Sequence, residues 1–155
     1  MNHKSTAKEG SAPSRQAETD IRFGDVYLMR FSGEGSEQCG YRPGVVFQNN
    51  VGNNHSPNII ALPITSNRRR VGQPTHVELF AGESNGLSVD SVILCENPER
   101  MSKRRLGKRL ARLSRKEIKD MAIANALASS ALGYLDYDEL ISVWKQSKKL
   151  NGILD

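Results

Sequence analysis

The residues that build metal centres and disulfide frameworks are scarce in this chain of 155 residues. There are two cysteines, Cys39 and Cys95, and neither belongs to a CxxC pair. The three histidines show no i, i+4 spacing or other pattern typical of metal ligands. Two isolated thiols cannot form a zinc cluster and make a weak disulfide framework. We therefore expect reduced cysteines and neither a bound metal nor another cofactor.

Long hydrophobic runs are also missing. No stretch reaches the roughly 18 apolar residues that a membrane-spanning helix needs, and residues 1–20 lack the apolar segment of a secretory signal. We expect a cytoplasmic protein that does not associate with a membrane. Residues 1–21 carry mainly small and charged side chains, which cannot offset the entropy lost on ordering. They are predicted to form a disordered tail.

Positive charge, in contrast, is concentrated in one segment. Between Arg100 and Asp120, ten Lys and Arg stand against two acidic residues, although the whole chain carries a net charge of only +5. A second cluster consists of Arg68, Arg69 and Arg70. Such clusters suit a polyanion because phosphate binding is driven largely by counterion release. The alternative is that the long basic run is a solvated helical face.

Five strand-like runs follow Phe23 and are separated by turn residues: DVYLMRF, PGVVFQ, NIIALPITS, THVELF and DSVILCE. In the first run, Val26, Leu28 and Arg30 alternate with Tyr27, Met29 and Phe31. The stretches VVF, IIAL and VIL are continuously apolar, which is typical of strands covered on both faces. Strands joined by loops rather than helices predict a curled antiparallel sheet.

Helical texture is expected only after Arg100. Ser114 followed by Glu117 is a capping box, which predicts the start of a helix there. The helix is expected to continue through Leu132 and to stop at Gly133. Strands followed by helices make the predicted fold class α+β.

A second helix is predicted from Asp136 and Glu139, which repeat the capping pattern. It would be amphipathic and would carry Trp144. An amphipathic helix that carries a tryptophan is expected to dock on this domain or on a partner.

In their order along the chain, six segments resemble the MazF/PemK family of toxin endoribonucleases: FGDVYLMRF, GSEQCGYRP, VVFQNNVGN, PNIIALPITS, PTHVEL and DSVILCEN. The resemblance covers about residues 23–133. Its most specific pieces are the GSEQ…RP and PIT segments. It implies an SH3-like barrel of the MazF/PemK/CcdB type with C-terminal helices in 22–133, followed by an extra helical extension in 134–155.

The same resemblance implies the toxin of a type II toxin–antitoxin system, a homodimer that cleaves single-stranded RNA at short sequences without a metal. Family members commonly cut by attack of the ribose 2′-OH on the adjacent phosphate, which leaves a 2′,3′-cyclic phosphate and a 5′-OH. Besides RNA, the implied partner is a cognate antitoxin with an acidic segment that is disordered until bound.

Arg42 of the RP pair and Thr65 of the PIT strand carry the chemistry in such members. A guanidinium presents a rigid fork of donors to phosphate oxygens that gain charge during cleavage. Pro43 restricts the backbone, so the direction of Arg42 is preset at the strand entrance. A hydroxyl at the end of an apolar strand can donate to a phosphate oxygen. Taken alone, Arg42 could be a surface ion-pair partner and Thr65 an ordinary strand residue.

Further candidates complete the predicted site. Glu96 matches an acidic position of several members and is predicted to be the general base for the 2′-OH. Some relatives place an arginine two residues before that acid, whereas this chain has Leu94, which leaves Arg42 as the default proton donor. His76 is a lone histidine in a strand and is not expected to be a catalyst. The predicted RNA-binding residues are Ser36, Glu37, Gln38, Arg68, Arg69, Arg70 and His76.

One alternative from another functional class stays open. The chain could be a non-catalytic SH3-like barrel that binds nucleic acid or a protein target such as a topoisomerase. The presence of both Arg42 and Thr65 favours the enzyme.

Overall fold

The computed structural model describes residues 20–32, 40–67 and 72–153. Its strands are β1 (Asp25–Arg30), β2 (Tyr41–Val46), β3 (Asn58–Thr65), β4 (His76–Leu79), β5 (Ser91–Leu94), β6 (Glu99–Ser102) and β7 (Leu106–Arg112). Its α-helices are α1 (Asn50–His55), α2 (Arg115–Leu127) and α3 (Tyr137–Leu150). Short 3₁₀ helices, η2 (Lys103–Arg105) and η3 (Ala131–Tyr134), connect β6 to β7 and α2 to α3. Among the described residues, no helix is long and apolar enough to cross a membrane.

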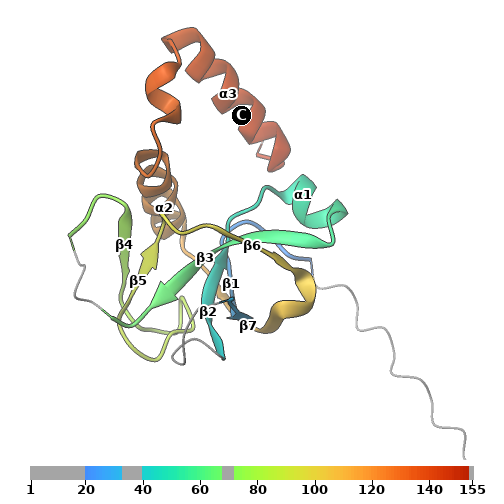
Figure 1. The fold of residues 1–155 in the computed structure, drawn as a ribbon, viewed down its shortest axis with the longest axis vertical. Coiled ribbons are helices and arrows are strands. Elements are labelled where there is room, and N and C mark those ends of the chain that lie inside the picture. Colours follow the sequence, from blue (N-terminus) through green and yellow to red (C-terminus); the bar gives the residue numbers. More distant parts are fainter. Residues whose placement is uncertain (1–19, 33–39, 68–71, 154–155) are drawn as a thin grey trace, which may run out of the picture.

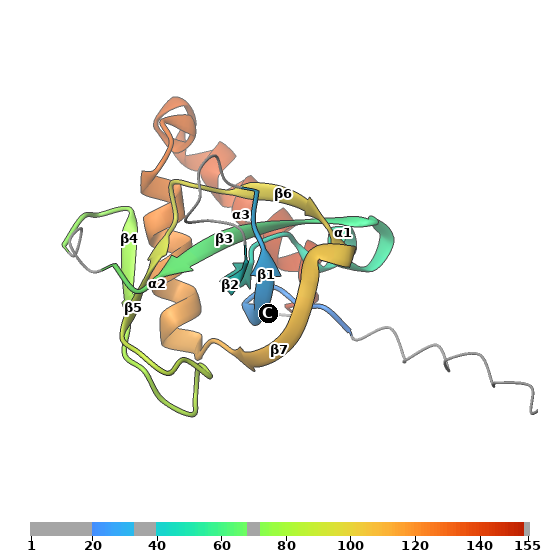
Figure 2. The same cartoon turned by 60° about the horizontal axis from the view of Figure 1, so that its bottom comes forward.

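The seven strands form one antiparallel sheet in the order β4-β5-β3-β2-β1-β7, with β6 also paired to β3. The long strand β3 is the centre of this arrangement, because Asn58–Ala61 pairs with β6 and Ile64–Thr65 pairs with β5. From β6 the chain turns through η2 into β7 at the far end, so the sheet curls around without closing (Figures 1 and 2). The predicted curled, antiparallel α+β fold is confirmed.

The central strands are buried on both faces. One cluster places Val45 and Leu62 against Met121 of α2. On the opposite face, a second cluster includes Val46 and Ile59. The expectation for the continuous apolar runs is therefore confirmed, and each fully buried aliphatic side chain contributes on the order of 1.5–3 kcal/mol to folding.

The helix α2 begins as predicted but ends early. Ser114 and Glu117 form a complete capping box, whereas the helix ends at Leu127 and not near Gly133. Gly133 lies within η3, and its φ is not positive, so it cannot act as a left-handed helix stop. The expected C-terminal boundary of this helix was wrong. Near its start, α2 packs against Gly24, whose φ is +88°. A Cβ on Gly24 would lie 2.7 Å from Cδ1 of Ile118, so only glycine leaves room for that side chain.

The segment after Glu99 also differs from the expectation of helical texture, since it first forms β6 and β7. In β7, Leu106 packs against the second cluster and Leu110 packs against the first. The apolar residues of this strand therefore contact both core clusters. The charged residues between them masked this pattern in the sequence. A short helix, α1, was likewise not predicted; the side chain of Asn49 caps it by accepting a hydrogen bond from the backbone N–H of Gly52.

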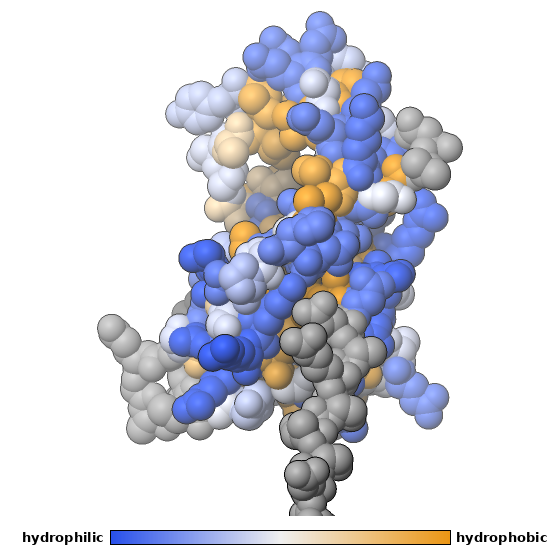
Figure 3. Space-filling view, turned by 90° about the vertical axis from the view of Figure 1, so that its right-hand side faces the viewer, coloured by the Kyte–Doolittle hydropathy of each residue, from blue (hydrophilic) through white to orange (hydrophobic). Residues whose placement is uncertain are grey.

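The second predicted helix is confirmed as α3, with a capping box between Asp136 and Glu139. None of its residues is buried, and Trp144 is 55% exposed. Its C-terminal end is tied to α1, where the Asn50 backbone N–H donates to Oδ1 of Asn151 at 3.1 Å. Figure 3 shows hydrophobic side chains gathered between the helical arm at the top and the body of the molecule.

Candidate functional site

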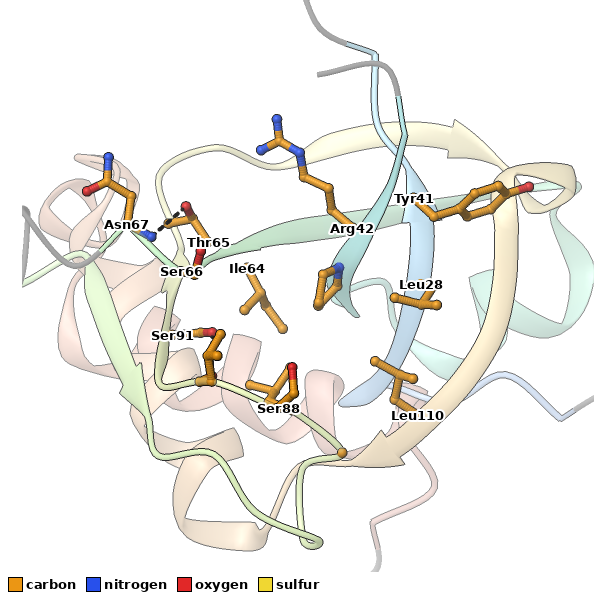
Figure 4. Close-up of a pocket in the computed structure, with 14 residues that line it drawn as sticks. Leu28, Tyr41, Arg42, Ile64, Thr65, Ser66, Asn67, Ser88, Ser91 and Leu110 are labelled. Carbon is orange, nitrogen blue, oxygen red and sulfur yellow. Dashed lines mark hydrogen bonds between the residues drawn. The ribbon is translucent and has the colours of Figure 1, made fainter. Parts of the chain in front are cut away.

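A pocket of about 640 Å³ opens where β2, β3 and β7 converge, and both Arg42 and Thr65 line it. Its apolar floor includes Leu28, Ile64 and Leu110. The hydroxyls of Ser66, Ser88 and Ser91 add polar groups to its walls. Figure 4 shows the Arg42 guanidinium and the Thr65 hydroxyl along the same rim. The structure therefore brings together the two residues predicted to carry the chemistry.

Arg42 is the second residue of β2 and is half-buried. Its backbone pairs with Met29 of β1, which fixes its place in the sheet. The next residue, Pro43, lines the pocket and restricts the local backbone. A half-buried guanidinium acts where water is partly excluded, and its interaction with a phosphate is stronger there than in bulk water.

Thr65 is the last residue of β3, and its partner across the sheet is Val92 of β5. Its Oγ1 accepts a hydrogen bond from the backbone N–H of Asn67 at 3.1 Å (Figure 4). A hydroxyl that accepts one bond keeps its own proton to donate. The local turn thus holds the oxygen in place and leaves a donor for a phosphate oxygen.

Glu96 lies away from this pocket. It lies in a turn that follows the end of β5, two residues beyond Leu94. It lines a second pocket of about 450 Å³ together with Phe47 and Asn125. The structure does not place Glu96 beside Arg42 and Thr65, and its role as general base stays a prediction.

The side chain of Glu96 contacts that of His76, whose Nε2 lies 2.7 Å from Oε1 of the carboxylate. The His76 side chain is 1% exposed. Burial raises the pKa of Glu96, but hydrogen bonds from His76, its own backbone and Thr75, together with the charge of His76, leave the pKa below its ordinary value. The imidazole faces the second pocket's carboxylate and not the Arg42 pocket, so its predicted contact with RNA also stays untested.

Cys95 is a buried free thiol next to this pair. Burial and the neighbouring charge of Glu96 raise its pKa to about 12. A thiol with so high a pKa is almost entirely protonated at neutral pH and is a poor nucleophile. The free thiol fits the expectation of a reduced cysteine at this position.

Several predicted RNA contacts lie outside the described residues: Ser36, Glu37, Gln38, Arg68, Arg69 and Arg70. So does Cys39. Two described residues near these segments in the chain, Tyr41 and Asn67, line the Arg42 pocket.

In the basic run from Arg100 to Lys119, some side chains form ion pairs and others do not. The side chain of Asp25 is 1% exposed, and its Oδ1 forms ion pairs with Nη2 of Arg109 at 3.1 Å and Nη1 of Arg112 at 3.5 Å. Further ion pairs join Arg105 to Glu99 and Lys116 to Asp120. Within this run, the exposed basic side chains that form no ion pair with a described residue are Arg100, Arg104, Lys108, Arg115 and Lys119. The run is therefore not one continuous solvated helical face.

Sequence reasoning missed Ser88 and Ser91 as pocket residues. Ser88 lies in the segment between β4 and β5, and Ser91, which is 4% exposed, is the first residue of β5. Only the pairing of β5 with β3 brings this segment opposite Arg42. No local motif marks these serines. In residues 20–32, 40–67 and 72–153, no group of three or more His, Cys, Asp or Glu could hold a metal ion.

Comparisons with known proteins identify the family of this chain. The family of PemK-like, MazF-like toxins of type II toxin–antitoxin systems matches residues 22–130. An endoribonuclease MazF of Staphylococcus epidermidis is 44% identical over 119 residues, 76% of this chain and 96% of that protein. An endoribonuclease MazF of Staphylococcus saprophyticus is 43% identical over 102 residues, which cover 65% of this chain and 84% of the relative.

Solved structures show the same fold. A mycobacterial endoribonuclease in complex with its cognate antitoxin has a TM-score of 0.57 and 26% identity, covering 74% of this chain and 97% of its own. MazF of Deinococcus radiodurans has a TM-score of 0.56 and 26% identity, with coverage of 72% and 96%. The family match over most of the chain and these relatives place the chain in the family of PemK-like, MazF-like toxins of type II toxin–antitoxin systems.

Proposed function

We propose that this chain is an endoribonuclease toxin that cleaves single-stranded RNA in the pocket lined by Arg42 and Thr65. The observation that carries the proposal is the presence of both side chains on the rim of one pocket (Figure 4). The curated relatives, which share 43–44% identity with the chain, are named as endoribonucleases.

In the proposed reaction, the ribose 2′-OH attacks the adjacent phosphorus and the 5′-oxygen of the next nucleotide leaves. The new P–O bond gives a 2′,3′-cyclic phosphate, and the leaving oxygen takes up a proton to become a 5′-OH. Negative charge increases on the phosphate oxygens in the transition state. Arg42 stabilises this charge through its fork of N–H donors, and it is the default donor near the leaving oxygen.

Thr65 positions the same phosphate. Its Oγ1 accepts a hydrogen bond from the Asn67 N–H, so the hydroxyl proton remains available to a phosphate oxygen. A donor held in advance by the fold loses little entropy when substrate binds. Thr65 and Arg42 would thus hold the phosphate from neighbouring strands.

Glu96 is proposed as the general base on the strength of its match to an acidic position in the family. Its lowered pKa keeps the carboxylate ionised at neutral pH, the form that accepts a proton. Its place in the second pocket supports an alternative, in which the ion pair with His76 stabilises the fold. Glu96→Gln separates these roles, since a base would affect the rate whereas a structural pair would affect only stability.

We further propose two protein partners. One is a cognate antitoxin, because a structural relative was solved in complex with its own. The other is a second copy of the chain, in a homodimer whose RNA groove crosses the interface. Residues 134–155 lie beyond the family match, which ends at residue 130, and this supports their assignment as an extra extension.

The test is to incubate the purified chain with a mixed RNA pool in EDTA and to map the new 5′ ends. We expect site-specific cleavage and 5′-OH termini, with Arg42→Ala as the inactive but folded control. Activity that disappears on chelation and returns with Mg²⁺ would contradict the proposed chemistry. Binding of RNA without cleavage would instead favour the non-catalytic alternative.

A further inference from the structure

We propose that Tyr41 is a base-stacking platform for the nucleotide next to the scissile phosphate. This inference rests on the proposed function, since it assigns a further RNA contact in the same pocket. Tyr41 directly precedes Arg42 and lines the pocket. It is 56% exposed, and among the exposed aromatic residues of the described chain it alone lines this pocket.

The ring rests on a surface that is free of side chains. A Cβ at Gly107 of β7 would lie 3.0 Å from both Cδ1 and Cε1 of Tyr41. Glycine at this position therefore lets the ring lie against the strand backbone. Figure 4 shows Tyr41 extending from β2 towards β7, while Arg42 points along the other rim. One side of the ring is supported by the sheet, and more than half of the side chain remains open to solvent.

The strand register places Tyr41 on the same face as two other pocket residues. Tyr41 pairs with Arg30 and Pro43 pairs with Leu28 in the antiparallel ladder of β1 and β2. Side chains of directly opposed residues lie on the same face of a sheet. Tyr41 thus shares its face with Leu28 and Pro43, which line the pocket, and not with the buried core under Met29.

Two basic residues flank the platform. Arg30 is the partner of Tyr41 across the ladder, and Lys108 follows Gly107 on β7. Both are exposed, and neither forms an ion pair with a described residue. Single-stranded nucleic acids are typically bound by aromatic rings that stack on bases between cations that contact phosphates. Around Tyr41, the strands supply such cations at two positions: Arg30 lies opposite it on β1, and Lys108 lies next to Gly107 on β7.

The binding test uses a short single strand of mixed sequence with 2′-O-methyl riboses, which removes the attacking hydroxyl and leaves binding measurable. Tyr41→Leu keeps apolar contact with the sheet but has no π face, and we expect its affinity to fall about tenfold or more. Tyr41→Phe and Tyr41→Trp should bind like the parent. Tyr134→Ala is the matched control, because Tyr134 is 86% exposed and lies in η3, away from the pocket.

Two further readouts distinguish stacking from charge or from misfolding. A strand containing 2-aminopurine should lose fluorescence on binding the parent, and this loss should be smaller with Tyr41→Leu. The salt dependence should be the same for both proteins, because no phosphate contact is removed. Gly107→Val, which leaves Tyr41 intact but displaces its ring, should reproduce the weaker binding.

The outcomes separate this inference from the proposed function. If the parent cleaves RNA and Tyr41→Leu binds as tightly as the parent, the platform is wrong and the enzyme assignment stands. If the parent neither binds nor cleaves RNA, the proposed function itself is wrong. A weaker Tyr41→Leu together with an equally weak Tyr41→Phe would also overturn stacking, since it would assign the effect to the hydroxyl.

Discussion

Asp25 of β1 and Arg109 of β7 form an ion pair across the far end of the curled sheet, with Nη2 of the arginine 3.1 Å from Oδ1 of the carboxylate. The Asp25 side chain is 1% exposed, and its other oxygen accepts a hydrogen bond from the Arg22 backbone N–H. Arg109 is thus held by the fold although the sequence places it in a run of surface charges.

Arg109→Gln should therefore destabilise the domain. Loss of the guanidinium leaves a buried carboxylate with fewer donors, which costs about 1–3 kcal/mol. Lys108→Gln, one residue away on an exposed side chain without an ion pair, should change the unfolding free energy by less than about 0.5 kcal/mol. Urea unfolding followed by circular dichroism measures both. Equal stability of the two variants would show that the ion pair does not contribute.

Thr65 offers an isosteric test of the pocket. Thr65→Val keeps the branched shape but removes the hydroxyl, so we expect the cleavage rate to fall by on the order of 10²-fold, as for loss of one transition-state donor. Thr65→Ser keeps the hydroxyl and should retain most of the activity. Single-turnover cleavage of a mapped RNA site measures the difference. A valine variant as fast as the serine variant would remove Thr65 from the chemistry.

The pair of His76 and Glu96 predicts a loss of stability in acid. The pKa of Glu96 is lower in the folded chain than its ordinary value of 4.5, so the unfolded state binds more protons over the interval between them. The stabilisation is present above 4.5 and is lost as the pH falls through the lowered folded value. Glu96→Gln should flatten this part of the curve of unfolding free energy against pH. An unchanged acid limb in the variant would assign the acid sensitivity to other groups.

Local sequence patterns predicted those features that depend on neighbouring residues. The capping boxes at Ser114 and Asp136 are of this kind, because all their hydrogen bonds join residues three apart. The strands β6 and β7 were missed because their evidence is non-local. Arg109 is explained only by Asp25, which lies 84 residues earlier in the chain.

The candidate site divides in the same way. Arg42 and Thr65 could be predicted because the RP pair and the PIT strand occur together in the order of the family's segments, whereas neither residue is distinctive when taken alone. Ser88 has no such motif and reaches the pocket only through the path of the chain between β4 and β5. The separation of Glu96 from Thr65 follows from the register of β5 on β3, which no local pattern contains.

The exposed basic residues near β7 lead to the last prediction, which concerns the salt dependence of RNA binding. Arg104 and Lys108 are exposed and have no ion pair in the described chain, in contrast to Arg109. If they contact phosphates, each substitution by Gln should reduce the slope of log affinity against log salt by about 0.7. The preferred cleavage sequence should not change, because phosphate contacts position RNA without reading its bases.

Lys119→Gln is the matched control for that measurement. Lys119 is equally exposed but lies on α2, which contributes no residue to the Arg42 pocket. Its removal lowers the net charge of the chain by the same amount, so a general effect of net charge would appear in all three variants alike. A slope that falls for Arg104→Gln and Lys108→Gln but not for Lys119→Gln would locate the RNA path along β7. Equal slopes in all three would contradict a phosphate track at this edge of the sheet.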